Sequence, residues 1–118
     1  MDKQVSWLVE VEVKPGQLET FEALVNDMVE STSVEPGTLS YEWFISDDGT
    51  VVHIYERYAD SEELLKHFQG FLEKFAERFS AAVDLKRFAV YGEPSSAARE
   101  ALDALNPIYL GTLGGFVR

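Results

Sequence analysis

Cysteine is absent from the 118-residue sequence, and basic residues are scarce, since 10 lysines and arginines stand against 21 aspartates and glutamates. Without cysteine there can be no disulfide framework, no iron–sulfur cluster, no thiolate zinc site and no cysteine nucleophile. The formal net charge of −11 would repel the phosphate backbone of a nucleic acid. The sequence therefore disfavours nucleic acid as a partner.

Long hydrophobic runs are also absent. No apolar run approaches the roughly 18 residues that a membrane span needs, and residues 1–5 hold no apolar signal-peptide segment. We therefore expect a cytoplasmic protein without a membrane partner. Apolar residues make up 46% of the chain and aromatic residues 13%, which is enough for an ordered core. Because a domain usually holds about 150 residues, the length predicts one compact unit.

Runs of alternating polar and apolar residues predict four strands, because successive side chains of a strand lie on opposite faces of a sheet. The four runs cover residues 4–13, 39–46, 51–58 and 83–91. Apolar residues spaced by three and four predict one helix from Gln17 to about Ser31 and a second that begins at the capping sequence Asp60-Ser61-Glu62-Glu63. Gly70 is a candidate position for a kink or break in the second helix.

The dipeptide Asp48-Gly49 between the second and third runs is typical of a two-residue hairpin loop in a type I′ turn. Counting outward from this loop pairs Tyr41 with Glu56. The pairing separates a mainly apolar face from a mixed one. The apolar face carries Leu39, Tyr41, Trp43, Ile45, Val52, Ile54, Glu56 and Tyr58.

The order β-α-β-β-α-β predicts an α+β fold of the ferredoxin-like type, in which both helices cover one face of an antiparallel sheet. The apolar face then lies under the helices. The mixed face, with Phe44 and Tyr55 beside His53 and Arg57, is left without a cover inside the chain. Two copies packed sheet against sheet would cover it, so we expect a homodimer.

Residues 1–94 would form this ferredoxin-like domain, and residues 95–118 would add a helix and an extended tail. Ser95 is a candidate cap for a helix that ends near Leu105. The tail after it is too apolar to remain exposed. We expect the tail to pack on the sheet edge or on the partner subunit, where it would complete the dimer or cover the mouth of a pocket.

Several motifs follow one another in a recognisable order: Lys14-Pro15-Gly16, Phe21, Glu35-Pro36-Gly37-x-Leu39-x-Tyr41, Glu56-x-Tyr58, and His67 nine residues further on. Over about residues 4–92 this pattern resembles the antibiotic-biosynthesis monooxygenase (ABM) domain. The resemblance implies a dimeric α+β barrel with a ligand pocket between sheet and helices. The family includes cofactor-independent oxygenases of polycyclic aromatics, quinol monooxygenases and haem-degrading enzymes, so it implies the fold more firmly than the reaction.

Haem degradation is disfavoured by the same resemblance. The haem-degrading relatives resemble one another in an Asn on the first strand and in a Trp and a His on the second helical segment. Here the first strand holds no Asn, and His67 and Glu77 stand at the Trp and His positions. Tyr58 replaces a common Trp of the general family pattern, whereas Glu56 and His67 are retained.

His67 and Glu56 are the candidate catalytic residues. An oxygenase without metal or flavin needs a substrate that forms its own carbanion or semiquinone, so the protein supplies an apolar pocket, a proton acceptor and hydrogen bonds to substrate oxygens. Imidazole suits proton transfer near neutral pH. A carboxylate on the apolar face favours its neutral form unless it is paired. The alternative is a structural role, in which Tyr41, a backbone amide or His67 satisfies Glu56.

Aromatic side chains on the same face, and one on the second helix, are the candidate substrate-binding residues or else plain core. They are Trp7, Tyr41, Trp43, Tyr58 and Phe68. The two histidines, His53 and His67, lie fourteen residues apart on different faces, which predicts no metal site, and we expect no cofactor.

Two functions remain open at this stage. One is a monooxygenase of a small aromatic or quinol-like molecule, and the other is a non-catalytic dimer that binds a small apolar ligand or fills its pocket with its own side chains. A pocket of a few hundred Å³ reached by both His67 and Glu56 would favour the first function.

Overall fold

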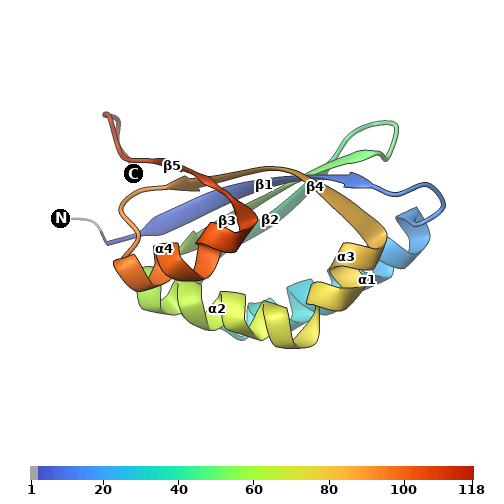
Figure 1. The fold of residues 1–118 in the computed structure, drawn as a ribbon, viewed down its shortest axis with the longest axis horizontal. Helices are drawn as coiled ribbons and strands as arrows, with labels where there is room; N and C mark the ends of the chain where they lie inside the picture. The colour runs from blue at the N-terminus through green and yellow to red at the C-terminus, as the bar shows by residue number, and fades with distance from the viewer. Residues whose placement is uncertain (1–2) are drawn as a thin grey trace.

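The computed structural model describes residues 3–118, in which helices cover one face of a five-stranded sheet (Figure 1). The strands are β1 (Val5–Val13), β2 (Thr38–Ile45), β3 (Val51–Tyr58), β4 (Val83–Tyr91) and β5 (Ile108–Leu110). The helices are α1 (Leu18–Ser33), α2 (Ser61–Lys74), α3 (Ala76–Ala82), α4 (Ser96–Leu102) and the 3₁₀ turn η1 (Asp103–Leu105).

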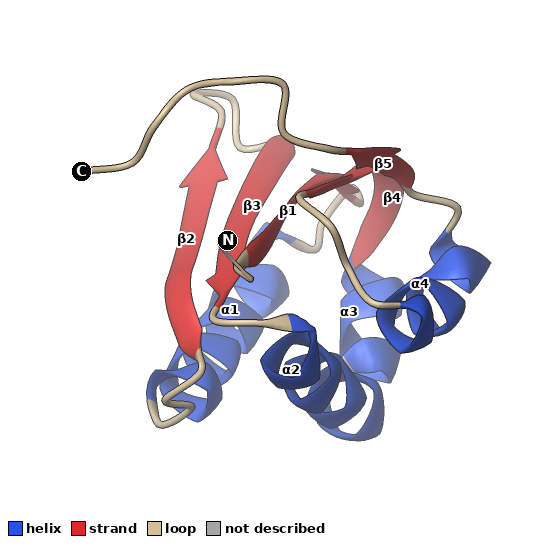
Figure 2. Ribbon diagram, turned by 90° about the vertical axis from the view of Figure 1, so that its left-hand side faces the viewer, coloured by secondary structure: helices blue, strands red, loops and turns tan. Residues whose placement is uncertain are grey.

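The sheet order is β2-β3-β1-β4-β5, and neighbours among the first four strands are antiparallel. This arrangement confirms the predicted ferredoxin-like fold. The sheet as a whole is mixed, because β5 pairs with β4 in parallel. Since α4 and η1 carry the chain back along the sheet, residues 108–110 enter the edge in the same direction as β4 (Figure 2).

The predicted register of the β2–β3 hairpin is confirmed, since Tyr41 pairs with Glu56 and Trp43 with Ile54. The apolar face is less complete than the pattern predicts. Leu39 and Ile45 lie near the two ends of the edge strand β2 and are about half exposed. The register shifts next to Leu39, which interrupts the alternation there.

The predicted two-residue loop at Asp48-Gly49 is wrong. The Ser46 N–H donates to the Val51 carbonyl, and the Gly49 N–H donates to the Ser46 carbonyl, so residues 47–50 form a four-residue loop around a tight turn. Gly49 has a positive φ of 74°, but Asp48 does not, as a type I′ turn would require. The Asp48 carboxylate instead accepts hydrogen bonds from Thr50 and Ser46. These bonds stabilise the wider loop and lower the pKa of the Asp48 carboxyl group.

The predicted break at Gly70 is also wrong. Helix α2 continues through Gly70 to Lys74, and the helical path is interrupted at Phe75, where φ is −129°. The bend brings the Phe79 ring of α3 against the Phe71 ring of α2, with centroids 5.4 Å apart. Packing of aromatic side chains, rather than the flexibility of glycine, therefore sets the position of the break.

The buried side chains form two core clusters between the sheet and the helices. One contains Trp7, Tyr58, Leu64 and Phe88 and extends to Leu102 of α4. The other is built from Val11, Val13, Phe21, Val52, Ile54, Ala82 and Val83. None of the helices within residues 3–118 combines the length and the hydrophobicity that crossing a lipid bilayer requires.

The C-terminal segment begins with α4, whose N-cap Ser95 accepts a hydrogen bond from the Ala98 N–H. Ala98 and Leu102 are fully buried, which attaches the helix to the core. After β5 the chain leaves the sheet on the side away from the helices (Figure 1), and Leu113 and Phe116 are exposed there. Whether residues 111–118 complete a dimer or act as a lid stays a prediction.

Candidate active site

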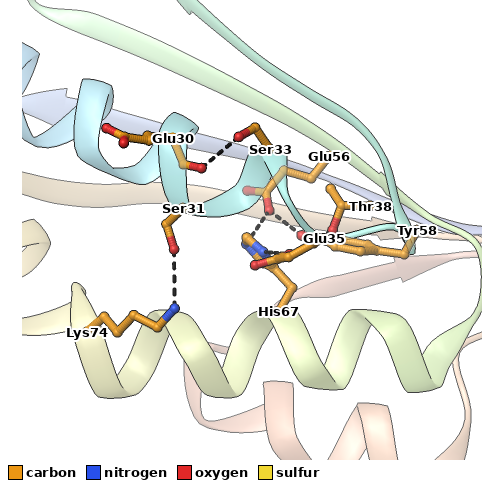
Figure 3. A network of polar contacts seen from close by, with 9 residues as sticks. All are labelled: Glu30, Ser31, Ser33, Glu35, Thr38, Glu56, Tyr58, His67 and Lys74. Carbon is orange, nitrogen blue, oxygen red and sulfur yellow. Dashed lines mark hydrogen bonds and ion pairs between the residues drawn. The ribbon is translucent and has the colours of Figure 1, made fainter.

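The side chain of His67 lies between two carboxylates (Figure 3). Asp60 caps the first turn of α2, accepting the Glu63 N–H at 2.9 Å, and His67 follows almost two turns later on the side that faces the sheet. Its Nδ1 is 2.8 Å from Oε1 of Glu35, and its Nε2 is 3.1 Å from Oε1 of Glu56. Only 7% of the His67 surface is exposed.

Contact with two carboxylates favours the imidazolium form of His67, because both ring nitrogens must donate a proton to make both hydrogen bonds. Burial opposes the charge, but the hydrogen bonds and negative charges of Glu56 and Glu35 outweigh it and raise the pKa of His67. A histidine in this state is a poor proton acceptor. Its charge instead stabilises the neighbouring carboxylates.

Glu56 is the buried carboxylate of the site, with 5% of its surface exposed. Its Oε1 accepts hydrogen bonds from the Tyr58 hydroxyl and from His67 Nε2, so its partners are His67 and Tyr58 rather than Tyr41. The second oxygen, Oε2, takes part in neither contact. Burial, reinforced by the charge of Glu56, raises the pKa of Tyr58 well above its usual value and keeps its hydroxyl protonated as a donor.

Glu35 belongs to the same group, although the sequence indicated only a turn at Glu35-Pro36-Gly37. Helix α1 ends at Ser33, and the turn that follows brings the Glu35 carboxylate to His67 and to the Thr38 hydroxyl, 2.8 Å away. A Cβ at Gly37 would overlap the Glu63 side chain, so the turn packs closely against α2. The only signal in the sequence was that this turn belongs to the motif series that ends in His67.

A cavity of about 300 Å³ lies beside this group, between the sheet and the helices. It is lined by residues of both core clusters, and six of the seven predicted site residues line it: Trp7, Tyr41, Trp43, Glu56, His67 and Phe68. Tyr58 does not. It is fully buried and reaches the cavity only through its hydrogen bond to Glu56.

Two tryptophans form part of the cavity wall. Trp7 packs edge-on against Tyr58 and Phe88, with ring centroids 5.2 and 5.3 Å away, and its buried Nε1 has no hydrogen-bond partner. Trp43 packs edge-on against Tyr41, with ring centroids 5.6 Å apart, and its Nε1 is buried as well. Burial and the charge of Glu56 raise the pKa of Tyr41, so its phenol stays neutral. The cavity wall is therefore mainly aromatic, with Tyr41, Glu56 and His67 as polar residues on it.

No cluster of three or more His, Asp or Glu side chains with metal-binding geometry occurs within residues 3–118. Among the described residues that line the cavity, Glu56 offers a carboxylate, His67 an imidazole held between two carboxylates, and Tyr41 a phenol. They can accept a proton, donate hydrogen bonds and stabilise charge.

Fold and site together define a ferredoxin-like α+β protein with an aromatic cavity beside a carboxylate–histidine–carboxylate group. The sequence profile of the family described as antibiotic biosynthesis monooxygenase matches residues 5–85. The chain belongs to this family, as the order of its motifs predicts. No curated protein sequence matches the chain significantly.

Solved structures extend the comparison. MupZ from Pseudomonas fluorescens is 29% identical, with a TM-score of 0.89 over 100% of this chain and 91% of its own. SnoaB from Streptomyces nogalater, a cofactor-independent oxygenase, is 14% identical, with a TM-score of 0.66 over 80% of this chain and 96% of its own. A conserved protein from Methanosarcina mazei Go1 is 18% identical, with a TM-score of 0.69 over 76% of this chain and 92% of its own. The last two likenesses show the fold alone.

Proposed function

We propose that the protein is a cofactor-independent monooxygenase that acts on a small aromatic or quinol-like substrate in the cavity between sheet and helices. The observation that carries this proposal is the cavity of about 300 Å³ that both Glu56 and His67 line. A core filled by its own side chains would have favoured a structural role. Membership of the antibiotic biosynthesis monooxygenase family supports the proposal, as does the likeness to SnoaB, a cofactor-independent oxygenase.

The residues divide the work as follows. A hydroxyl of the substrate donates a hydrogen bond to Glu56, which accepts its proton as the substrate becomes an electron-rich anion. His67 and Tyr58 hold Glu56 in place through Oε1.

The oxidation draws its electrons from the substrate itself. The anion transfers electrons to O₂, one oxygen atom forms a new carbon–oxygen bond, and the other leaves as water with two hydrogens of the substrate. For anthrone the balance is one anthrone and one O₂ giving one anthraquinone and one water. The protein supplies the proton acceptor and an apolar cavity that orients the substrate.

Oxygen consumption with anthrone and a panel of hydroquinones tests the proposal. We expect uptake of one O₂ per quinone formed, incorporation of one ¹⁸O atom from ¹⁸O₂, and a rate lowered about 100-fold or more by Glu56→Gln, since a general base contributes roughly 10²–10⁴-fold. Glu42→Gln, an exposed carboxylate of β2 outside the cavity lining, is the matched control. Uptake equal to the uncatalysed rate, or uptake unchanged by Glu56→Gln, would contradict the proposal. Ligand binding without oxygen uptake would favour the non-catalytic alternative.

We further propose that the protein is a homodimer that packs two sheets face to face. The sheet face away from the helices carries Phe44, which is 56% exposed, together with Tyr55, Arg57 and the His53–Glu10 ion pair. An apolar residue among polar partners is typical of an interface. Light scattering should give twice the mass of the chain, and Phe44→Asp should shift the protein toward a monomer. A wild-type monomer at micromolar concentration would refute the dimer.

A further inference from the structure

The residues that line the cavity differ sharply in solvent exposure, and this difference distinguishes a closed end of the cavity from an open one. Glu56, Trp7 and Ile54 are at most 5% exposed, so they form the closed end. Leu72, Leu85 and Leu105 also line the cavity but are 52%, 43% and 39% exposed. Lining residues that are also open to solvent mark the mouth. We name these three residues the leucine rim.

Sheet register places the rim and Glu56 far apart. Glu56 of β3 pairs with Trp7 of β1, whereas Leu85 of β4 pairs with Val11, four residues further along β1. Two strand spacings across the sheet and four residues along it put the Cα atoms of Glu56 and Leu85 about 16 Å apart. On α2, Leu72 follows His67 by more than one turn. The polar group and the rim therefore occupy opposite ends of one cavity.

Leu105 comes from a part of the chain outside the region that the family profile matches, which ends at residue 85. Figure 1 shows α4 beside α2 on the helical side of the sheet, with the chain turning back into β5 just after η1. Leu105 ends η1, and the next residue, Asn106, has a left-handed φ of 53° that reverses the chain. The C-terminal segment thus supplies one side of the mouth.

Charge at the cavity favours a neutral ligand. The charged groups that line it are Glu56, His67 and Asp84, and Asp84 lies at the exposed end beside Leu85. His67 already contacts two carboxylates, so it offers little to an additional anion. A carboxylate ligand would approach Asp84 and then Glu56, and the described residues that line the cavity offer no free cation to neutralise it.

We propose that the cavity takes a neutral, elongated amphipathic aromatic, with its hydroxyl or keto end at Glu56 and its apolar end at the leucine rim, and that Leu105 limits the length of the apolar end. This proposal rests on the proposed function for the reaction but concerns which substrate is accepted.

The test uses 4-alkylphenols with unbranched chains from methyl to octyl. The chain contains two tryptophans, Trp7 and Trp43, and both line the cavity, so quenching of tryptophan emission excited at 295 nm reports binding. We expect the affinity to rise about fourfold with each added methylene, equivalent to about 0.8 kcal/mol, until the alkyl chain reaches the rim, and then to level off. 4-Octylbenzoate, an anion of similar shape, should bind at least tenfold more weakly than 4-octylphenol.

Leu105→Trp tests the role of the rim, and Leu110→Trp is its matched control, because Leu110 belongs to the same segment and is 40% exposed but does not line the cavity. Leu105→Trp should weaken 4-octylphenol at least tenfold and change 4-methylphenol less than twofold, whereas Leu110→Trp should change neither. Leu105→Ala, which only shortens a half-exposed side chain, should bind the branched 4-tert-octylphenol at least fivefold more tightly than the parent.

Equal weakening of short and long phenols by Leu105→Trp, an effect shared by Leu110→Trp, or an affinity independent of chain length would overturn the proposal. The same variants, tested for oxygen uptake with alkylhydroquinones, separate this proposal from the proposed function. Length-dependent binding without oxygen uptake would refute the oxygenase and leave the rim assignment standing. Oxygen uptake that does not depend on alkyl chain length or on Leu105 would refute the rim assignment and leave the oxygenase standing.

Discussion

Replacing Tyr58 by Phe removes one hydrogen bond from the centre of the site and little else. Tyr58 is fully buried, and its hydroxyl donates to Oε1 of Glu56. The ring, which packs against Trp7 at 5.2 Å and His67 at 5.4 Å, is retained in the variant. The cost is therefore that of a hydrogen bond to a charged acceptor, about 1.5–3 kcal/mol.

Chemical denaturation measures this cost directly. We expect the free energy of unfolding to fall by about 2 kcal/mol, because the buried Glu56 loses one of its two donors and no water replaces it. At roughly 4 °C per kcal/mol for a chain of this size, the melting temperature should fall by about 8 °C.

Tyr91→Phe is the matched control for this measurement. Tyr91 also lies on a strand and is partly buried, but its hydroxyl makes no hydrogen bond within the part of the chain that the structure describes. Its loss should change the free energy of unfolding by less than about 0.5 kcal/mol. If Tyr58→Phe unfolded at the same urea concentration as the parent, or as Tyr91→Phe, the Tyr58–Glu56 bond would contribute nothing and the reasoning would fail.

Three further predictions follow from the site and the hairpin. Glu35→Gln should lower the pKa of His67, which NMR titration of the imidazole would show, and an unmoved midpoint would remove Glu35 from the site. The pKa of His67 is raised in the folded state, so protonated His67 stabilises the fold fully below about pH 6.5. This stabilisation is lost as the pH rises through the pKa of His67 in the folded protein. The loss should be smaller in Glu35→Gln. Burial raises the pKa values of Tyr41 and Tyr58, so stability should fall as the pH rises above about 10, where the unfolded chain releases protons that the folded chain retains; melting temperatures unchanged from pH 9 to 11 would contradict this. Gly49→Val should destabilise the fold by at least about 1–2 kcal/mol, because Gly49 has a φ of 74°, and calorimetry would detect the lower melting temperature.

Local pattern was sufficient for the elements and for the pairing of the hairpin. Alternation in β1 and β3 and the three-and-four spacing in α1 and α2 depend only on neighbours along the chain, so they can be read without the fold. The details of turns and breaks could not be read in this way. The side-chain hydrogen bonds of Asp48 widened the loop, and the contact of Phe71 with Phe79 moved the helix break to Phe75.

In the candidate site, too, some residues could be predicted from the sequence and others could not. Glu56 and His67 could be named in advance, because a carboxylate on an apolar strand face and a histidine in an aromatic helix are unusual in any sequence. Glu35 could not be named, because its role depends on a side chain 32 residues away that only the packing of the α1–β2 turn on α2 brings within 2.8 Å. For the same reason, the sequence could not predict that His67 contacts two carboxylates.

By itself, the sequence determined the strand and helix order, the hairpin register, the apolar face of the sheet and the family, all of which follow from short-range periodicity and ordered motifs. Tertiary structure decided the contacts of His67 with two carboxylates, the cavity that both core clusters line, and the place of Leu105 at its mouth. These features arise where the α1–β2 turn, the sheet, α2, α3 and η1 meet. Their physical cause is close packing between distant segments, which sets the distances, burial and charge on which chemistry depends.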